Sequence, residues 1–407
     1  MPRLLDVFVR FLHLGCTSFG GPIAHLGYFR REFVERAQWL DDAAFSEIVA
    51  LCSVLPGPTS SQVGMVIGAR RAGPAGGLLA WVGFTGPTAI VLISLGMALR
   101  ISAAQAGVFT QSAGFGGLLE GFAAAAAAVV ALAVYQLGRN LIRTRIDAGI
   151  ALTALAIALV ADRYAPTFQW LALATGGALG AVFLRNASAL PLRAPALAVS
   201  RRTATICGAA FVLLLVGLPI VAPAGSYLDL FATFFRAGSL VFGGGHVVLP
   251  FLQSFIGAGV SERTFFAGYG VTQAMPGPLF AFSGFLGAVT RPLGGVPAAL
   301  VALAGIFLPS FLLIAAVMPL WKALRELPRA SATLAGVNAA VVGLLAAVLV
   351  DPIATSLVHD PLGIALALAA FALLLYARWP AWLPVALCGA AGLFLRSGII
   401  EQLIHRA

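Results

Sequence analysis

Long apolar runs follow one another along almost the whole chain, and short polar stretches separate them. Runs such as 121–133 and 150–160 are apolar on every face and rich in Ala, Leu and Val. A membrane β-strand would instead alternate polar and apolar residues, so the pattern favours helices. At roughly 20 residues per bilayer crossing, it predicts about thirteen membrane segments: 5–21, 43–70, 76–98, 113–137, 147–161, 168–184, 204–222, 228–243, 264–290, 294–319, 331–350, 361–376 and 380–396.

The composition agrees with this pattern. The 407 residues are 60% hydrophobic and 10% charged, whereas an ordinary soluble domain carries about 25% charged residues. A soluble fold cannot bury so much apolar surface, so we expect the lipid bilayer to be the solvent. The sequence therefore predicts an all-α polytopic membrane protein.

Positive charge dominates the polar stretches. The formal net charge is +10, and Lys322 is the one lysine among 25 basic residues. We interpret this charge as a topology signal and as a complement to an anionic substrate, because arginine is the better partner for oxyanions. We do not expect a nucleic-acid partner. The four cysteines form no C-x-x-C pair, and we predict no metal or cofactor.

The chain contains an internal repeat. Phe and Gly residues of 8–22 recur in 231–245, and the Pro-Gly-Pro of 56–58 recurs at 276–278. The paired positions, in chain order, are Phe8/Phe231, Phe11/Phe234, Gly15/Gly238, Phe19/Phe242, Gly20/Gly243, Gly21/Gly244, Gly64/Gly284, Arg71/Arg291, Gly83/Gly305 and Pro87/Pro309. The series predicts two homologous repeats, 1–185 and 227–407, joined by a linker and connecting helix at 186–226.

The basic loops orient the two halves. The loops 139–145, 185–202 and 322–329, with the pair at 70–71, are the most basic and are predicted to face the cytoplasm. An N-terminus inside the cell places all of them there and places 351–360 outside. The two repeats then run in opposite directions, which predicts an inverted-topology pair.

The Pro-Gly-Pro tripeptides interrupt two apolar segments at matching positions. In transporters, broken helices of this kind surround the substrate site. A half-helix that starts near Pro58 exposes free N–H groups and the positive end of its dipole, which suit an oxyanion. The candidate substrate-binding residues at the two breaks are Pro56, Gly57, Pro58, Thr59, Ser60, Ser61 and Gln62 in the first half, and Gln273, Pro276, Gly277 and Pro278 in the second.

Two glycine turns provide further candidates. Gly20 and Gly21 in the first half, and Gly243, Gly244 and Gly245 in the second, allow close approach to a ligand, although tight helix packing would also explain them. His25 and His246 follow these turns and are candidates for binding the anion or carrying a proton, with a purely structural role as the alternative.

Charged residues inside apolar segments are rare and usually face a cavity. Arg236 is the candidate counter-charge for the substrate, with snorkelling to the interface as the alternative. Glu47 and Glu120 are candidates for proton coupling, or they pair with arginine. Residues 30–42 mix both signs of charge and are typical of an interfacial helix.

The chain lacks the usual enzyme signatures. It contains no H-E-x-x-H, P-loop or G-x-S-x-G motif. We therefore expect no enzymatic activity and no ATP binding of the usual kind, which leaves secondary transport or transport driven by a partner.

Several motifs together resemble the chromate ion transporter family of the long-chain, two-domain type. They are FGGP-IAHLG at 19–27, C-SVLPGP-TSSQ at 52–62, FGGGHVVLP at 242–250, QAMPGPLF at 273–280 and GIFLP at 305–309. The resemblance implies export of chromate, with sulfate as a related dianion, chromate resistance and a location in the inner membrane. Ser53 and Ser310 depart from the family pattern, and Ser53 lies beside the predicted site.

Three other interpretations fit the residues alone. One is a general sulfate-like oxyanion carrier, and another is a membrane-embedded enzyme that modifies lipid. The third is a structural or regulatory membrane protein, which would have a dry, filled interior between the two breaks. The sequence leaves the coupling ion and the oligomeric state open.

Overall fold

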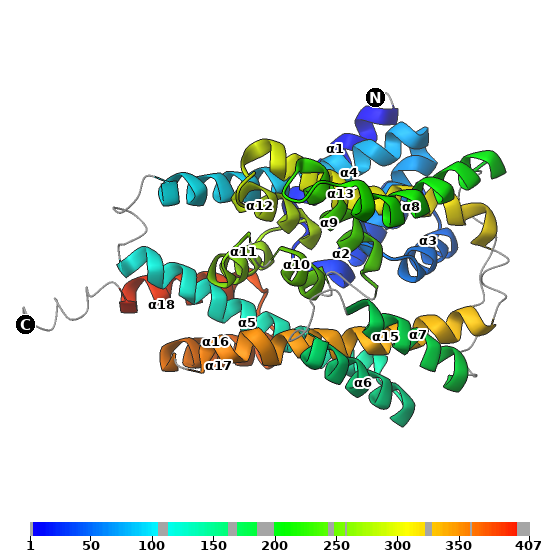
Figure 1. Ribbon diagram of the computed structural model, residues 1–407. Coiled ribbons are helices and arrows are strands. Elements are labelled where there is room, and N and C mark those ends of the chain that lie inside the picture. The colour runs from blue at the N-terminus through cyan, green and yellow to red at the C-terminus, as the bar shows by residue number, and fades with distance from the viewer. Residues whose placement is uncertain are drawn as a thin grey trace, which may run out of the picture.

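The computed structural model describes residues 3–104, 113–161, 169–184, 199–242, 248–256, 259–321, 328–358 and 360–396. Within these ranges the chain is helical and contains no β-strand, as the sequence predicts (Figure 1). Helices occupy each predicted apolar segment, and five of those described are long and apolar enough to cross a membrane. The candidates Gly243, Gly244, Gly245 and His246 lie outside the described residues.

The first half begins with short helices and continues with longer ones. Its elements are α1 (Arg3–Thr17), α2 (Gly21–Arg30), the π-helix η1 (Arg31–Arg36), α3 (Asp42–Val54), α4 (Thr59–Ala104), α5 (Ala113–Leu141), α6 (Arg145–Ala161) and α7 (Gln169–Phe183).

The second half starts after a connecting helix. Its elements are that helix, α8 (Arg201–Val221), then α9 (Tyr227–Leu240), α10 (Val248–Ile256), α11 (Glu262–Ala274), the 3₁₀-helix η4 (Leu279–Ala281), α12 (Phe282–Val289), α13 (Gly295–Val317), η5 (Met318–Leu320), α15 (Pro328–Val348), η6 (Leu349–Ala354), α16 (Thr355–Leu357), α17 (Pro361–Leu375) and α18 (Trp382–Arg396).

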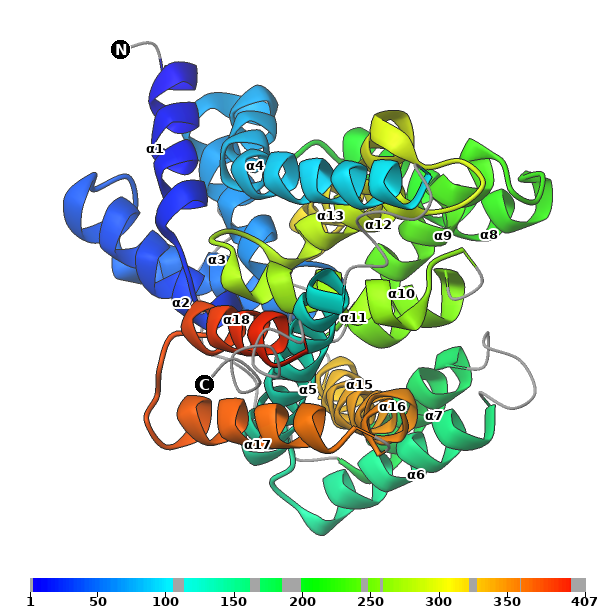
Figure 2. The same ribbon diagram turned by 90° about the vertical axis from the view of Figure 1, so that its left-hand side faces the viewer.

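The helices form two groups. Figures 1 and 2 show α1, α4, α8, α9, α12 and α13 at the top, and α5, α6, α7, α15 and α17 at the bottom. Glycines hold the lower group together, because Gly176 and Gly180 of α7 face Gly336 of α15 at backbone contact, and Gly343 of α15 faces Ala151 of α6. Such small-residue contacts are how helices pack closely in lipid.

The two halves repeat one helix contact in atomic detail. A Cβ on Gly15 would lie 2.6 Å from the Gly83 oxygen, and the equivalent Gly238 meets the Ile306 oxygen. A Cβ on Gly83 would lie 2.9 Å from the Phe8 oxygen, and one on the equivalent Gly305 would lie 2.9 Å from the Phe231 oxygen. The repeated glycines thus let α1 pack on α4, and α9 on α13, through the same positions.

The proline residues end the helices where the sequence predicts. Residues before proline avoid the helical region, and Leu55 and Met275 are indeed extended. Pro56 and Pro58 therefore separate α3 from α4, and Pro276 and Pro278 separate α11 from η4. Each broken helix also has a capped start, since Asp41 accepts from the Ala44 amide and Ser261 from the Thr264 amide.

The helix α4 contains a reversal that the sequence did not predict. Ala72 and Gly73 have non-helical dihedral angles, and Gly73 has a φ of 72°. The part of α4 before Ala72 folds back on the part after Gly73. The close approach of the two parts is seen at Gly77, where a Cβ would lie 3.0 Å from the Met65 oxygen. In the second half, α12 and α13 fold back in the same way, with Gly287 against the Ala298 oxygen.

Ion pairs show where the first-half helices begin and end. Arg71, at the end of the first stretch of α4, pairs with Asp6 at 3.6 Å and lies over the Trp39 ring. Arg10 pairs with Glu32 of η1 and lies over the same ring. The start of α1, the end of η1 and residue 71 therefore share one end of the molecule. Straight passages by 5–21 and 43–70 would instead put 22–42 at the opposite end, so in the structure α1 with α2, and α3 with the first stretch of α4, run away from this end and come back to it.

The stretch 30–42 is charged and exposed, as expected of an interfacial segment. Arg30 donates to Asp42 at 2.8 Å and also pairs with Glu35. The hydrogen bond to Asp42 raises the pKa of the exposed Arg30 guanidinium above its ordinary value. This segment stays polar on its outer face while Phe33 is buried beneath it.

Candidate functional site

Each helix break forms a backbone hydrogen bond with the other half of the chain, close to a predicted glycine turn. The Gly57 amide donates to the Val241 carbonyl at 2.7 Å, and the Gly277 amide donates to the Ser18 carbonyl at 2.9 Å. Ser18 and Val241 occupy equivalent positions in the repeat, each just before a Phe-Gly-Gly turn. Each break is therefore bound to a residue of the other half that precedes its glycine turn in the sequence, and the two breaks lie at the interface between the repeats.

Both tripeptides require glycine at their centre. Gly57 has a φ of 120° and Gly277 a φ of 88°, values that favour glycine. A Cβ on Gly57 would lie 2.5 Å from the Ser310 Oγ atom, and a Cβ on Gly277 would lie 2.5 Å from the Thr88 Oγ1 atom. The breaks thus approach α13 and α4 too closely for any side chain.

Ser310 and Thr88 are site residues that sequence reasoning missed. Thr88 donates from its hydroxyl to the Pro276 carbonyl. Gln62 donates from Nε2 to the Pro56 carbonyl at 2.7 Å and to the Ser310 hydroxyl at 3.2 Å. The signal that could have found both residues is that a hydroxyl residue directly follows the repeated prolines, 87 and 309.

Buried polar groups collect at the start of α4. The first N–H groups of a helix have no acceptor within it, and here they belong to Thr59, Ser60 and Ser61. Ser18, Ser61 and Gln62 are at most 2% exposed, and their Oγ, Oγ and Oε1 atoms have no hydrogen-bond partner in the described part of the chain. A buried polar atom without a partner costs about 1–3 kcal/mol, so these two hydroxyls, which can donate, and the Gln62 amide oxygen, which can only accept, are more than packing alone requires.

His25 connects the first glycine turn to the start of α4. Its Nδ1 atom lies 3.3 Å from the Ser60 hydroxyl and its Nε2 atom 3.2 Å from the Ser18 carbonyl. The ring packs edge-on against Phe84 and is 1% exposed. The histidine therefore has partners on both nitrogens and touches the site directly.

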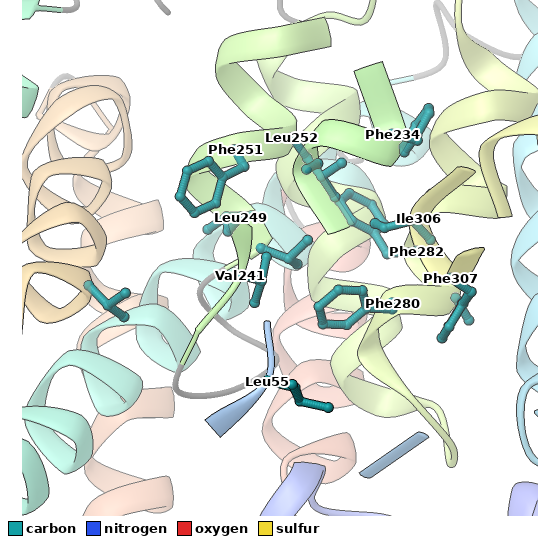
Figure 3. Packing of buried hydrophobic residues seen from close by; sticks show 14 of the residues in the cluster. Leu55, Phe234, Val241, Leu249, Phe251, Leu252, Phe280, Phe282, Ile306 and Phe307 are labelled. Carbon is teal, nitrogen blue, oxygen red and sulfur yellow. The ribbon is translucent and has the colours of Figure 1, made fainter. Parts of the chain in front are cut away.

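Apolar side chains seal the region between the breaks. Figure 3 shows Leu55, Val241, Phe280 and Phe307 in one buried cluster drawn from both halves. Phe280 packs on Phe307 with ring centroids 6.1 Å apart, and Trp81 of α4 packs on Phe307 at 5.4 Å. This is the dry packing that a purely structural protein would have.

A large cavity reaches the site from another direction. Its volume is about 1160 Å³, and its lining includes the predicted residues Gly20, Gly21, Gln273 and Gly277. The Gln273 Nε2 atom is buried and has no hydrogen-bond partner among the described residues. The site is therefore sealed on one side by apolar packing and open on the other, which a filled structural interior would not be.

Three predicted residues lie apart from these contacts. Arg236 is half-buried in α9 and does not belong to the described cavity lining, and Glu47 is 4% exposed in α3. Glu120 pairs with Arg263 at 2.7 Å and so joins α5 to the start of α11. Pairing with arginine was the alternative for this glutamate, and the roles of all three in transport stay predictions.

Broken helices from two repeats that meet at a buried polar site, with a cavity leading to it, are typical of secondary transporters in membranes. The family assignment follows from comparison with known proteins. A sequence model described as chromate transporter matches residues 5–181 and 228–393. The chain belongs to the chromate transporter family, and it is a transport protein rather than an enzyme.

Curated relatives extend over most of the chain. The chromate transport protein of Pseudomonas aeruginosa is 31% identical over 85% of this chain and 80% of its own. That of Cupriavidus metallidurans is 28% identical over 91% and 88%, and a probable chromate transport protein of Synechococcus elongatus is 28% identical over 84% and 82%. No solved structure matches the chain.

Proposed function

We propose that this protein exports chromate from the cytoplasm by secondary transport and thereby confers chromate resistance. The observation that carries the proposal is the crossed pair of helix breaks, which leaves the donors of Ser61 and the start of α4 buried at the interface between repeats. The names of the relatives supply the substrate, since these proteins are chromate transport proteins.

The direction of the two halves supports alternating access. The part of α4 from Pro74 to Ala104 is one continuous helix of about 45 Å at 1.5 Å per residue. It starts beside Arg71, where the first half turns, and near its other end Arg100 donates to the Thr290 carbonyl at 3.2 Å, where the second half turns. The turns at 71 and 291 are equivalent in the repeat, yet they lie at opposite ends of this one helix. We therefore infer that the two repeats run in opposite directions around the site.

The breaks support re-entrant hairpins within each repeat. The Arg291 amide donates to the Gly259 carbonyl at 3.2 Å, so the turns that precede α11 and follow α12 share an end. Residues 39 and 71 share the other end in the first half. We infer that four of the thirteen predicted crossings (5–21, 43–70, 228–243 and 264–290) enter the bilayer and return, with irregular backbone tolerated because it is buried in protein.

The chemistry of the pocket suits a dianionic oxyanion. Backbone N–H groups at a helix start and neutral hydroxyl donors bind such ions without a fixed counter-charge. We infer that the hydroxyls of Ser18 and Ser61 contact the oxyanion when the site opens, and that Gln62 joins them by turning its Nε2 donor away from the Pro56 carbonyl and the Ser310 hydroxyl. We infer that Arg236 supplies longer-range attraction from α9. Sulfate has the same charge and shape, so it is expected to compete.

The driving force for export is adequate without ATP. Moving a dianion out of a negative cytoplasm releases about 4.6 kcal/mol per 100 mV, which is a gradient of about three orders of magnitude. The cavity opens beside 139–145, the basic loop predicted to be cytoplasmic, so the described state suits loading from inside.

Everted membrane vesicles test the proposal. Vesicles that contain the protein are expected to accumulate radiolabelled chromate when the interior is positive, and to lose this accumulation when the potential is collapsed. Collapsing the proton gradient alone tests for a coupled proton. Saturation by sulfate at far lower concentration than by chromate would instead favour the sulfate-like carrier, and no accumulation of either ion would contradict the proposal.

A further inference from the structure

The mouth of the cavity carries a feature that the site itself does not use. Two elements far apart in the sequence meet there: the end of α5 contributes Arg139, and the turn after α17 contributes Arg378. Among the described residues that line the cavity, these arginines are the charged ones. Both are exposed, and neither forms an ion pair with a carboxylate in the described part of the chain.

Arg378 stands in a backbone conformation that suits glycine. Its φ is 54°, and the Trp379 amide donates to the Leu373 carbonyl at 3.3 Å across the end of α17. A side chain costs free energy in this conformation. Gln38 has a φ of 49° and the same bond, from the Trp39 amide to the Phe33 carbonyl, so the observation that singles out Arg378 is its place in the cavity lining.

Arg139 is held in place by its own helix. Its Nη1 atom donates to the Tyr135 hydroxyl at 3.1 Å, and the guanidinium lies over the Tyr135 ring at 5.7 Å. This leaves the remaining N–H donors of the planar guanidinium available for an oxyanion. Tyr135, which also lines the cavity, thus holds the charge of Arg139 at the cavity wall.

A polar path leads from these arginines to the helix breaks. Gln136 lies one turn before Arg139 on α5 and lines the cavity, and Gln273 and Gly277 line its inner end. Gln273 retains an unpartnered Nε2 donor there. An anion that enters between the arginines therefore meets neutral donors before it reaches the break.

We propose that Arg139 and Arg378 form a recruitment site for the oxyanion at the cytoplasmic mouth, separate from the transport site at the breaks. Positive charge at the entrance of a low-dielectric cleft raises the local concentration of an anion and speeds its arrival. The arginines act before the translocation step, so they affect capture rather than turnover. This inference rests on the proposed function.

Transport kinetics in everted vesicles test the recruitment site. In the double variant Arg139→Gln and Arg378→Gln, kcat/KM for chromate is expected to fall about tenfold at low ionic strength, mostly through a higher KM. The loss is expected to shrink to about twofold in 0.5 M potassium chloride, where the Debye length is below about 5 Å. Arg145→Gln removes the same charge from the same loop outside the cavity lining and is expected to stay within about twofold of the native protein.

Two further variants exclude a purely structural effect. Arg378→Gly relieves the left-handed backbone and is expected to raise thermal stability while it lowers kcat/KM, and Arg378→Lys is expected to recover most of the lost transport. A double variant that matches Arg145→Gln at low salt, or that loses kcat at unchanged KM, would overturn the recruitment site alone. A loss seen only in anionic lipid, and absent in phosphatidylcholine proteoliposomes, would assign the arginines to headgroup binding instead. Absence of chromate transport by the native protein would contradict the proposed function itself.

Discussion

At the scale of single residues, the account depends on two glycines that no other residue can replace. Gly57 and Gly277 combine a positive φ with a hydroxyl oxygen 2.5 Å from any Cβ. In this conformation the Gly57 amide reaches the Val241 carbonyl and the Gly277 amide reaches the Ser18 carbonyl. The geometry of the site is therefore set by backbone, which explains why so few charged side chains are found in it.

Replacing either glycine with alanine is expected to disable transport. Gly57→Ala or Gly277→Ala strains the backbone by about 1–3 kcal/mol and moves Ser310 or Thr88. We expect transport to fall at least tenfold, as about 1.4 kcal/mol corresponds to a tenfold effect, with a lower melting temperature in detergent. Gly86→Ala in α4, where a Cβ meets no atom within 4 Å, is the matched control and is expected to transport normally.

His25 is expected to support transport by holding Ser18 and Ser60 in place at the site. His25→Ala removes the contacts to Ser60 and Ser18 and leaves buried polar atoms, at a cost of about 1–3 kcal/mol. We expect strongly reduced chromate transport by His25→Ala and partial recovery by His25→Gln, which retains a donor, measured against equal amounts of inserted protein. Native rates in His25→Ala would show that this histidine serves packing elsewhere.

Sequence reasoning proposed candidate residues at the breaks but did not predict which residues they contact. The break residues 56–62 and 276–278 were predicted from proline, glycine and hydroxyl chemistry alone. Thr88 and Ser310 were missed because their hydroxyls reach the breaks only where helices from different halves pack together. The sequence pattern of one helix does not predict which helix packs against it. Glu120 shows the same limit, since its partner Arg263 lies 143 positions away in the chain.

At the scale of elements, the prolines predicted the residues at which the helices end, but not the direction that the chain takes after each end. The Pro-Gly-Pro break was predicted within a crossing, whereas Glu32 pairs with Arg10 and Trp39 lies under Arg71, which requires the chain to return to the end where it started. The direction of a chain after a turn depends on packing, here on glycine contacts such as Gly68 against Ala80. Hydropathy cannot distinguish a helix pair that enters the bilayer and returns from a helix that crosses it, because both are equally apolar.

Cysteine accessibility distinguishes the two arrangements. In a cysteine-free background, Arg36→Cys and Arg70→Cys are expected to react with an impermeant maleimide only from the cytoplasmic side. Arg291→Cys, the position equivalent to 71, is expected to react only from outside because the repeats are inverted. Labelling of residue 36 from outside would restore the thirteen complete crossings and contradict the returning hairpins.

At the scale of the whole molecule, the described state has one open and one closed side. The apolar cluster around Phe280 and Phe307 closes the interface between the two repeats. The cavity extends from Arg139 and Arg378 to Gly277 on the other side. A transporter that alternates must break this cluster and close the cavity, and the two helix groups seen in Figure 1 offer two bodies for that motion. Under the proposed function, the described state loads the anion from the cytoplasm, and the alternate state releases it outside.

The most direct test of the central claim is chromate flux through purified protein. Proteoliposomes that contain the native protein, Gly277→Ala or Gly86→Ala are given a potassium diffusion potential, and uptake of radiolabelled chromate is followed. The account predicts potential-driven flux for the native protein and Gly86→Ala, inhibited by sulfate, and a loss of at least tenfold for Gly277→Ala at equal reconstitution. Equal flux in all three proteins, or none in the native protein, would contradict it.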